Sequence, residues 1–332
     1  MNPREKRKLG RTDLTVTALG MGTAPLAGLY QAVPEGQAAE TLTQAWDLGL
    51  RYFDTAPLYG HGLAEQRSGK LLRQHPRNEF VLSTKVGRLL VPGEPPPESM
   101  YKGTPRVVPV FDFGYDAVMR SFEESLGRLG MDRVDILYIH DPDEHEDAVL
   151  RGAYPALARL REEGVVQAIG AGMNQSEMLA RFARQTDMDC FLLAGRYTLL
   201  EQGALDELLP ICEQKNIAIV IGGVFNSGLL ANPAPGARFN YEPAPADLVD
   251  RAARIAKVCE RWQVPIKAAS LQFPMAHPQV ASVLIGSRSR EHLEENVRLF
   301  ELEIPEGLWA DLKSASLLDE AAPVAGSRLA AR

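Results

Sequence analysis

The chain has 332 residues, of which 45% are hydrophobic, so it can bury a large core and is not a disordered or low-complexity sequence. At about 150 residues per domain this length fits two ordinary domains, but a single α/β barrel also reaches it. The net charge is −7 and no segment concentrates lysine and arginine, which argues against nucleic acid or an anionic membrane as a partner.

Cysteine usage and the N-terminus predict a cytoplasmic protein. Cys190, Cys212 and Cys259 lie far apart with no Cys-x-x-Cys pair, which fits reduced thiols better than a disulfide framework. The N-terminus is charged from Arg4 onward and lacks the apolar stretch of a signal peptide. The longest apolar run, 217–225, is too short to span a bilayer.

Short apolar runs rich in β-branched residues recur along the chain, and helical patterns separate them. The predicted strands are residues 18–22, 52–55, 80–85, 134–140, 166–170, 190–193, 217–221 and 281–286. Helical patterns lie between them, for example at 37–48, 117–129 and 246–262. Near-continuously apolar strands that alternate with helices indicate a parallel sheet covered on its faces. Eight such units predict an α/β protein with one (β/α)8 TIM barrel over residues 1–332.

The alternative is an open, doubly wound sheet with a dinucleotide at a Gly-x-Gly-x-x-Gly turn. Gly20 and Gly22 match the first two glycines of that motif. Pro25 occupies the position of the third and opposes entry into a helix. The sequence therefore does not support a Rossmann fold.

Two proline-rich insertions follow predicted strands. Residues 88–112 contain six prolines and residues 232–247 contain four. Because the loops after barrel strands lie over the catalytic face, we expect both insertions to form walls of an active site; surface decoration is the alternative. Four aromatic residues in or beside them are candidate pocket walls or simple loop anchors: Phe111, Phe113, Phe239 and Tyr241.

Three charged or titratable residues stand at the C-terminal ends of successive predicted strands: Asp54, Lys85 and His140. In a barrel these ends converge on one mouth, so the three side chains become neighbours. Each alone has an ordinary explanation, as a turn residue, a strand end or a buried histidine. All three at equivalent positions favour an active site.

Tyr59, five residues after Asp54, is the candidate general acid or base. The ordinary tyrosine pKa of about 10 is too high for proton transfer at neutral pH. An ammonium about 4 Å away, at an effective dielectric constant near 20, contributes roughly 4 kcal/mol, or about three pKa units. We expect Lys85 to supply that charge and Asp54 to hold the lysine. We expect His140 to donate a hydrogen bond to the substrate oxygen.

Ordered motifs over nearly the whole chain resemble the aldo-keto reductase superfamily. The matching segments are residues 8–12, 53–56 with Tyr59 and Gly60, 83–85, 135–140, and 286–288 with Glu295 and Asn296. The resemblance implies a nicotinamide cofactor and a catalytic tetrad of Asp54, Tyr59, Lys85 and His140. It also implies a barrel plugged at its bottom by an N-terminal β-hairpin over 6–19, and residues 315–332 are expected to form a C-terminal tail.

The resemblance also implies where the cofactor binds. The implied contacts are Gly22, Thr23, Asp54, Asn174, Phe225, Ser227, Gly228, Gly286, Ser287, Arg288, His292, Glu295 and Asn296. Many members stack a tyrosine under the nicotinamide where this chain has Gly222, and carry a glutamine where it has Ala194; Phe225 is the candidate replacement for the ring. Basic residues often stand at the positions of Gly286 and His292 in members that prefer NADP, so NAD is favoured here.

The predicted phosphate site and two further features each have an alternative explanation. Residues 286–289 end a strand and precede the helical pattern 291–300, so free N–H groups and the helix dipole would face an anion; an ordinary cap by Ser289 is the alternative. Asn174 binds the carboxamide by resemblance or is a left-handed loop residue. The run 140–145 contains possible metal ligands, but its position in one loop fits a solvated acidic turn, and no metal is expected.

Residues 191–202 and 222–228 resemble the aldose 1-dehydrogenase branch of the superfamily, with pyridoxal 4-dehydrogenases close by. The resemblance implies oxidation of C1 of a free aldopyranose, of the L-fucose, L-galactose or D-arabinose type, to its lactone with NAD or NADP. The alternatives are oxidation of pyridoxal and general reduction of aldehydes or ketones. A different class, a cofactor-binding regulatory protein without catalysis, is disfavoured by the intact Tyr59 and Lys85. Substrate and oligomeric state stay open.

Overall fold

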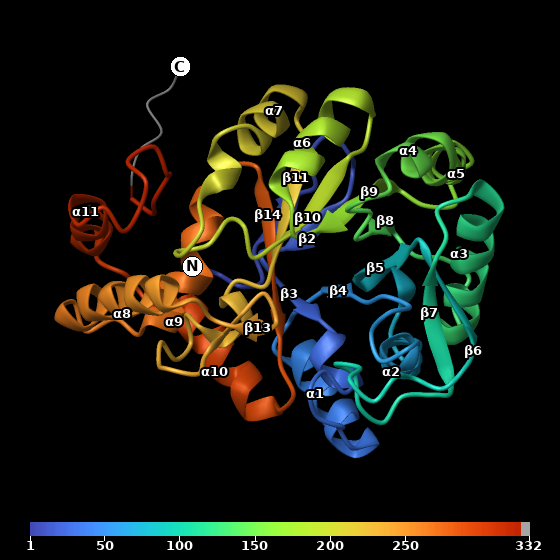
Figure 1. Ribbon diagram of the computed structural model, residues 1–332, viewed down its shortest axis with the longest axis horizontal. Helices are drawn as coiled ribbons and strands as arrows, with labels where there is room; N and C mark the ends of the chain where they lie inside the picture. The colour runs from blue at the N-terminus through green and yellow to red at the C-terminus, as the bar shows by residue number, and fades with distance from the viewer. Residues whose placement is uncertain (327–332) are drawn as a thin grey trace.

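Parallel strands close into an eight-stranded barrel in residues 1–326, the part of the chain that the computed structural model describes (Figure 1). In chain order the barrel strands are β3 (Leu19–Gly22), β4 (Tyr52–Asp54), β5 (Val81–Val86), β8 (Ile136–His140), β9 (Ala168–Met173), β10 (Cys190–Ala194), β11 (Ala218–Gly222) and β14 (Val280–Gly286). Each predicted strand lies within three residues of an observed one, so the predicted TIM barrel is confirmed. β14 pairs with β3 and thereby closes the ring.

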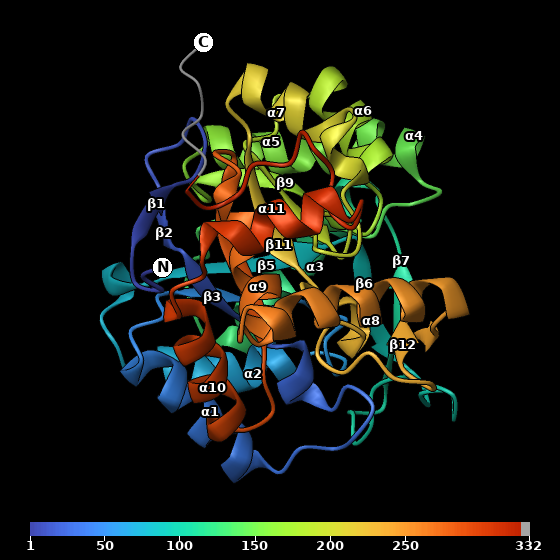
Figure 2. The same cartoon turned by 90° about the vertical axis from the view of Figure 1, so that its left-hand side faces the viewer.

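Helices surround the barrel on all sides (Figures 1 and 2). They are α1 (Glu35–Asp47), α2 (Leu63–Leu72), α3 (Tyr115–Leu129), α4 (Glu146–Ala148), α5 (Tyr154–Glu162), α6 (Ser176–Gln185), α7 (Leu208–Lys215), α8 (Ala246–Arg261), α9 (Ile266–Gln272), α10 (Arg290–Glu301) and α11 (Glu306–Ser314). The predicted helices at 37–48, 117–129 and 246–262 are α1, α3 and α8. In α3, Val118, Phe122 and Leu129 are buried on one face, and the helix ends at Gly130, whose φ is +62°.

The N-terminal hairpin closes one end of the barrel. β1 (Lys6–Lys8) pairs antiparallel with β2 (Thr15–Thr17). Leu9, Leu14 and Val16 pack against residues at the N-terminal starts of the barrel strands, including Val81 and Ile136. The predicted plug is therefore present, and the mouth at the opposite end is left for the functional site.

The two predicted loops over the mouth contain regular structure. Residues 88–112 form a hairpin of β6 (Arg88–Pro92) and β7 (Val107–Phe111), which lies beside α3 in Figure 1. Residues 232–247 contain the short pair β12 (Arg238–Phe239) and β13 (Glu242–Pro243). The prolines did not prevent pairing, because Pro92 and Pro109 stand in a two-stranded ribbon that has open edges.

The predicted tail, 315–332, lies partly outside the described residues. Leu317 and Leu318 are buried in the main hydrophobic core, and Arg251 donates a hydrogen bond to the Leu317 carbonyl at 2.9 Å. The first part of this segment is therefore packed against the barrel's helices. Within residues 1–326, no helix is both long and apolar enough to cross a membrane.

Candidate active site

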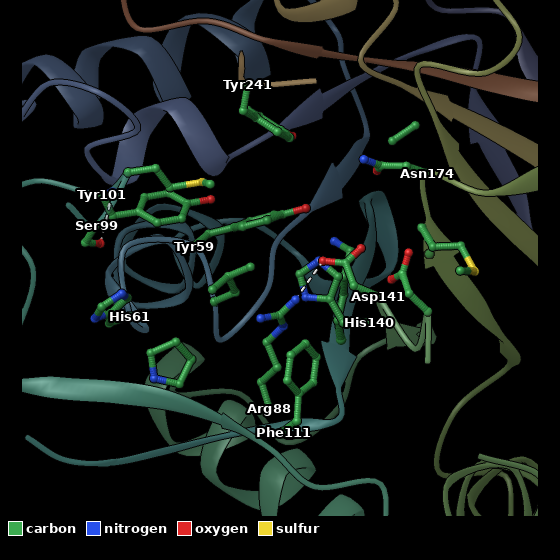
Figure 3. Close-up of a pocket in the computed structure, with 18 of the residues that line it drawn as sticks. Tyr59, His61, Arg88, Ser99, Tyr101, Phe111, His140, Asp141, Asn174 and Tyr241 are labelled. Carbon is green, nitrogen blue, oxygen red and sulfur yellow. Dashed lines mark hydrogen bonds and ion pairs between the residues drawn. The ribbon is translucent and has the colours of Figure 1, made fainter. Parts of the chain in front are cut away.

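A cavity of about 760 Å³ lies at the mouth of the barrel, where the strands have their C-terminal ends (Figure 3). Lys85 and His140, at the ends of β5 and β8, line its floor. Tyr101 and Phe111 from the 88–112 insertion and Tyr241 from the 232–247 insertion line its walls. Both insertions therefore contribute to one pocket.

Lys85 and Asp54 form a buried ion pair in the cavity floor. The Lys85 ammonium donates to Asp54 Oδ2 at 2.6 Å and to the Thr55 carbonyl at 2.9 Å, and both charged side chains are almost fully buried. Its Nζ lies 4.6 Å from the centroid of the Tyr59 ring. Asp54 and Lys85, which the sequence placed at neighbouring strand ends, are thus in contact, and Lys85 also lies against the Tyr59 ring.

A chain of hydroxyl groups inside the barrel supports Asp54 from below. Ser83 Oγ donates to Asp54 Oδ1 at 2.7 Å and lies 3.2 Å from the Tyr52 hydroxyl, which in turn lies 3.2 Å from that of Tyr138. Sequence reasoning missed Ser83. Its position in the sequence could have indicated the contact, because residues two apart on a strand face the same side and Ser83 precedes Lys85 by two.

Tyr59 reaches the site from the turn that follows β4. The turn depends on Gly60, whose φ is +60° and where a Cβ would approach the Ala27 carbonyl oxygen to 2.4 Å. The Tyr59 ring lies 5.6 Å from the His140 ring at an interplanar angle of 89° and 6.5 Å from the Tyr101 ring (Figure 3). Tyr59 and His140 therefore flank one small region of the cavity.

The expected lowering of the Tyr59 pKa is wrong for this structure. Burial raises the pKa of Tyr59 well above its ordinary value, and the Asp54 carboxylate raises it further. Lys85 does not offset these effects, because its charge is paired with Asp54 at 2.6 Å. The phenol of Tyr59 is therefore protonated at neutral pH.

His140 is neutral at neutral pH. Burial lowers the pKa of its imidazole well below the ordinary value, and the nearby cations Lys85 and Arg88 lower it further. Its Nδ1 is buried and has no hydrogen-bond partner among residues 1–326, and its Nε2 lies 3.5 Å from Asp141 Oδ2. A neutral imidazole still has one N–H to donate, which agrees with the role expected for His140.

Several residues predicted to bind the cofactor lie along the side of the mouth where β11, β14 and β3 are neighbours. Gly22 and Gly286 are register partners at the ends of β3 and β14, and a Cβ on Gly286 would approach Pro25 Cγ to 2.6 Å. Ser227 and Gly228 form an exposed turn after β11 with φ values of +58° and +100°. Thr23 donates its hydroxyl to the Asp54 carbonyl at 2.9 Å, which ties β3 to β4.

The remaining predicted contacts lie in the cavity, in the loop after β11, and at the start and in the middle of α10. Asn174 lines the cavity, and Phe225 lies half-buried with Lys267 Nζ 6.0 Å from its ring centroid. Ser287 is buried, whereas Arg288 and His292 are exposed at the start of α10. Glu295 accepts a hydrogen bond from Lys267 at 2.6 Å.

A buried amide on α10 supports the fit of a dinucleotide to this side. Asn296 is 4% exposed, and its Oδ1 has no hydrogen-bond partner within residues 1–326. An unpaired buried acceptor is costly unless a ligand satisfies it, and the amino group of an adenine is a suitable donor. Asn296, with Ser287 beside the strand end, therefore fits a nicotinamide dinucleotide.

The first turn of α10 is capped by its own side chains. Ser289 Oγ accepts a hydrogen bond from the His292 N–H at 3.3 Å, so Ser289 caps the helix, and phosphate binding at this turn stays a prediction. Hydrogen bonds from its own backbone N–H and from Ser289 lower the pKa of the Glu291 carboxyl. A carboxylate therefore lies in the first turn of α10, beside the predicted anion site.

The acidic run 140–145 is engaged by neighbouring side chains. Asp141 accepts from Arg88 at 2.9 Å, and Asp143 accepts from Gln175 at 2.7 Å. In the described part of the chain, no three His, Cys, Asp or Glu side chains are grouped so that they could hold a metal ion. The pairing of Arg88 with Asp141 was not predicted, because the two residues are 53 positions apart and meet only across the 88–112 hairpin.

Comparison with known proteins identifies the family that this barrel and site define. A model of the Aldo/keto reductase family matches residues 18–316, and the chain belongs to that family. It is therefore an oxidoreductase of the aldo-keto reductase type.

Two relatives cover nearly the full length. The chain is 44% identical over 336 residues to pyridoxal 4-dehydrogenase of Microbacterium luteolum, which covers 95% of this chain and 98% of that protein. It is 45% identical over 314 residues to D-threo-aldose 1-dehydrogenase of a Pseudomonas species, with 92% and 95% covered. Among solved structures, an aldo-keto reductase of Bacillus halodurans in its holo form matches with a TM-score of 0.76 over 94% of this chain and 96% of that one, at 24% identity.

Proposed function

We propose that the protein oxidises the anomeric hydroxyl of a free aldopyranose, of the L-fucose, L-galactose or D-arabinose type, to the lactone, and that it prefers NAD to NADP. The observation that carries this proposal is the arrangement of Tyr59 and His140 around one end of a polar and aromatic cavity, above the buried pair of Lys85 and Asp54. The similarity to D-threo-aldose 1-dehydrogenase supports it.

Tyr59 is the proton acceptor in this proposal. The chemistry that an oxidised nicotinamide would supply when bound is an acceptor for the hydride of C1 and a positive charge in the site. The Tyr59 phenolate takes the proton of the anomeric hydroxyl as the C1–H bond breaks, and the carbon becomes the carbonyl of the lactone. Burial raises the pKa of Tyr59 in the protein by itself. Lys85 is therefore not sufficient to generate the phenolate at neutral pH.

His140 and Asp54 hold the geometry of this proton transfer. The neutral His140 donates a hydrogen bond to the anomeric oxygen and orients its proton toward Tyr59. Asp54 fixes the ammonium of Lys85 beneath the Tyr59 ring. In the reverse direction the same groups serve carbonyl reduction, with the protonated Tyr59 as the acid.

The cofactor would bind along the ends of β3, β11 and β14. Asn296 and Ser287 would hold its adenine half, and Asn174 would contact the carboxamide in the cavity. The preference for NAD rests on the Glu291 carboxylate, which would repel a 2′-phosphate near the start of α10.

A second candidate substrate is pyridoxal, which is supported by the similarity to pyridoxal 4-dehydrogenase. Pyridoxal closes on itself to a cyclic hemiacetal, so its oxidation to a lactone breaks the same two bonds. The aromatic walls Tyr101, Phe111 and Tyr241 suit a flat ring.

A substrate panel tests the proposal. We expect multiple turnovers with L-fucose, L-galactose or D-arabinose and NAD, a higher kcat/KM for at least one sugar than for pyridoxal, and lower kcat/KM with NADP. A higher kcat/KM for pyridoxal would select the second candidate. A single slow oxidation of bound cofactor, without further turnover, would instead indicate the regulatory class.

A further inference from the structure

The residue after His140 has no role in the proton transfer described above, although it lines the same cavity. Asp141 has a left-handed backbone with φ of +44°, and its N–H donates to the Gly172 carbonyl at 2.9 Å. Aspartate and asparagine adopt this conformation more readily than other residues with side chains. The backbone thus fixes where the carboxylate stands.

The Asp141 carboxylate is held from the other side by the hairpin of β6 and β7. Arg88 Nη2 donates to Asp141 Oδ2 at 2.9 Å, and the Arg88 guanidinium lies 4.0 Å from the centroid of the Phe111 ring, its register partner on β7 (Figure 3). The Asp141 side chain keeps 30% of its surface exposed. Within residues 1–326, no group donates a hydrogen bond to its Oδ1.

The position of Asp141 relative to His140 indicates which substrate group the free Oδ1 acceptor of Asp141 would bind. Asp141 Oδ2 lies 3.5 Å from His140 Nε2, so a substrate oxygen bound to the imidazole is next to the carboxylate. In an aldopyranose, the group beside the anomeric oxygen is the hydroxyl on C2. That hydroxyl donates a proton, and the carboxylate is a strong charge-assisted acceptor.

We propose that Asp141, positioned by Arg88, binds the C2 hydroxyl of the sugar and makes the site selective for hemiacetals that carry a hydroxyl beside the reacting carbon. This inference rests on the proposed aldose oxidation. A substrate without that hydroxyl leaves Asp141 Oδ1 desolvated without a hydrogen-bond partner and is therefore discriminated against. Cyclic pyridoxal is such a substrate, because the carbon beside its hemiacetal carbon belongs to the aromatic ring.

The test compares D-arabinose with 2-deoxy-D-ribose, which is D-arabinose without its C2 hydroxyl. In the wild-type protein with NAD, we expect kcat/KM for D-arabinose to be about 10- to 100-fold higher. Asp141→Ala is expected to bring the ratio close to one, and Asp141→Asn to lower it by a smaller factor. Asparagine retains the left-handed backbone, so this variant tests the proposal even where alanine impairs folding.

Asp147→Asn is the matched control, because Asp147 is an exposed carboxylate on the same segment that pairs with Arg151 instead of lining the cavity. It is expected to leave the ratio unchanged. If Asp141 acted only through His140, its variants would slow both sugars equally, and the unchanged ratio would overturn the inference. Equal use of both sugars by the wild type overturns the inference but leaves the proposed function standing. Turnover of none of L-fucose, L-galactose and D-arabinose overturns both.

Discussion

The floor and the rim of the active site are held in different ways. On the floor, Asp54, Ser83 and Lys85 stand on neighbouring barrel strands and contact one another with little exposure to solvent. On the rim, Arg88 and Asp141 come from a hairpin and from a left-handed loop residue, and both are partly exposed. The barrel therefore fixes the groups proposed to move the proton, and the loops hold those proposed to choose the substrate.

Breaking the ion pair on the floor should have the largest effect on both stability and activity. Lys85→Met leaves Asp54 buried without a counter-charge, so we expect the free energy of unfolding to fall by about 3–5 kcal/mol and turnover to be almost abolished. Urea denaturation and steady-state kinetics measure the two effects. The double variant Lys85→Met, Asp54→Asn should recover part of the stability and none of the activity. Unchanged stability in the single variant would show that the pair is not buried as described.

Removing the support beneath the floor should cost less. Ser83→Ala deletes the 2.7 Å hydrogen bond to Asp54 Oδ1, and we expect kcat to fall about tenfold and unfolding to become easier by about 1–3 kcal/mol. Ser282→Ala is the matched control, since Ser282 is a buried barrel serine whose hydroxyl donates to the Thr17 carbonyl at 2.8 Å. It should lose similar stability with kcat unchanged. An equal drop in kcat in both variants would show that Ser83 does not position Asp54 for catalysis.

Removing one charge at the start of α10, away from the floor and the rim, should have the smallest effect. Glu291→Gln removes the carboxylate from the helix N-terminus, so the ratio of kcat/KM with NADP to that with NAD should rise by about two- to fivefold. Glu303→Gln, an exposed carboxylate beyond the end of α10, should leave the ratio unchanged. A ratio that does not move in the Glu291 variant would remove this residue from the explanation of cofactor choice.

The charged residues on the floor were predictable from the sequence, whereas the contact between Arg88 and Asp141 on the rim was not. Apolar runs predicted the eight strands. Because the ends of barrel strands converge, they also predicted that Asp54, Lys85 and His140 are neighbours. The pairing of Arg88 with Asp141 depends on the course of a 25-residue insertion and on one positive φ, which no spacing reveals.

The sequence also did not reveal how deeply side chains are buried or how the start of α10 is capped. The direction of the Tyr59 pKa was predicted wrongly, because spacing showed a nearby ammonium but not the desolvation that outweighs it. The phosphate site at the start of α10, predicted from glycine and serine positions, stays a prediction, and Ser289 also caps the helix there. The error concerns a side chain whose surroundings come from distant parts of the chain.

The pH dependence of sugar oxidation in wild type and Tyr59→Phe tests the central claim most directly. Only the phenolate accepts the proton, and burial raises the pKa of Tyr59, so the rate of oxidation should climb as the pH rises from about 6 toward about 10. Tyr59→Phe should lose about 10²- to 10⁴-fold in kcat and the pH-dependent rise with it. A variant that oxidises the sugar within about tenfold of the wild-type rate, with the same pH profile, would contradict the account.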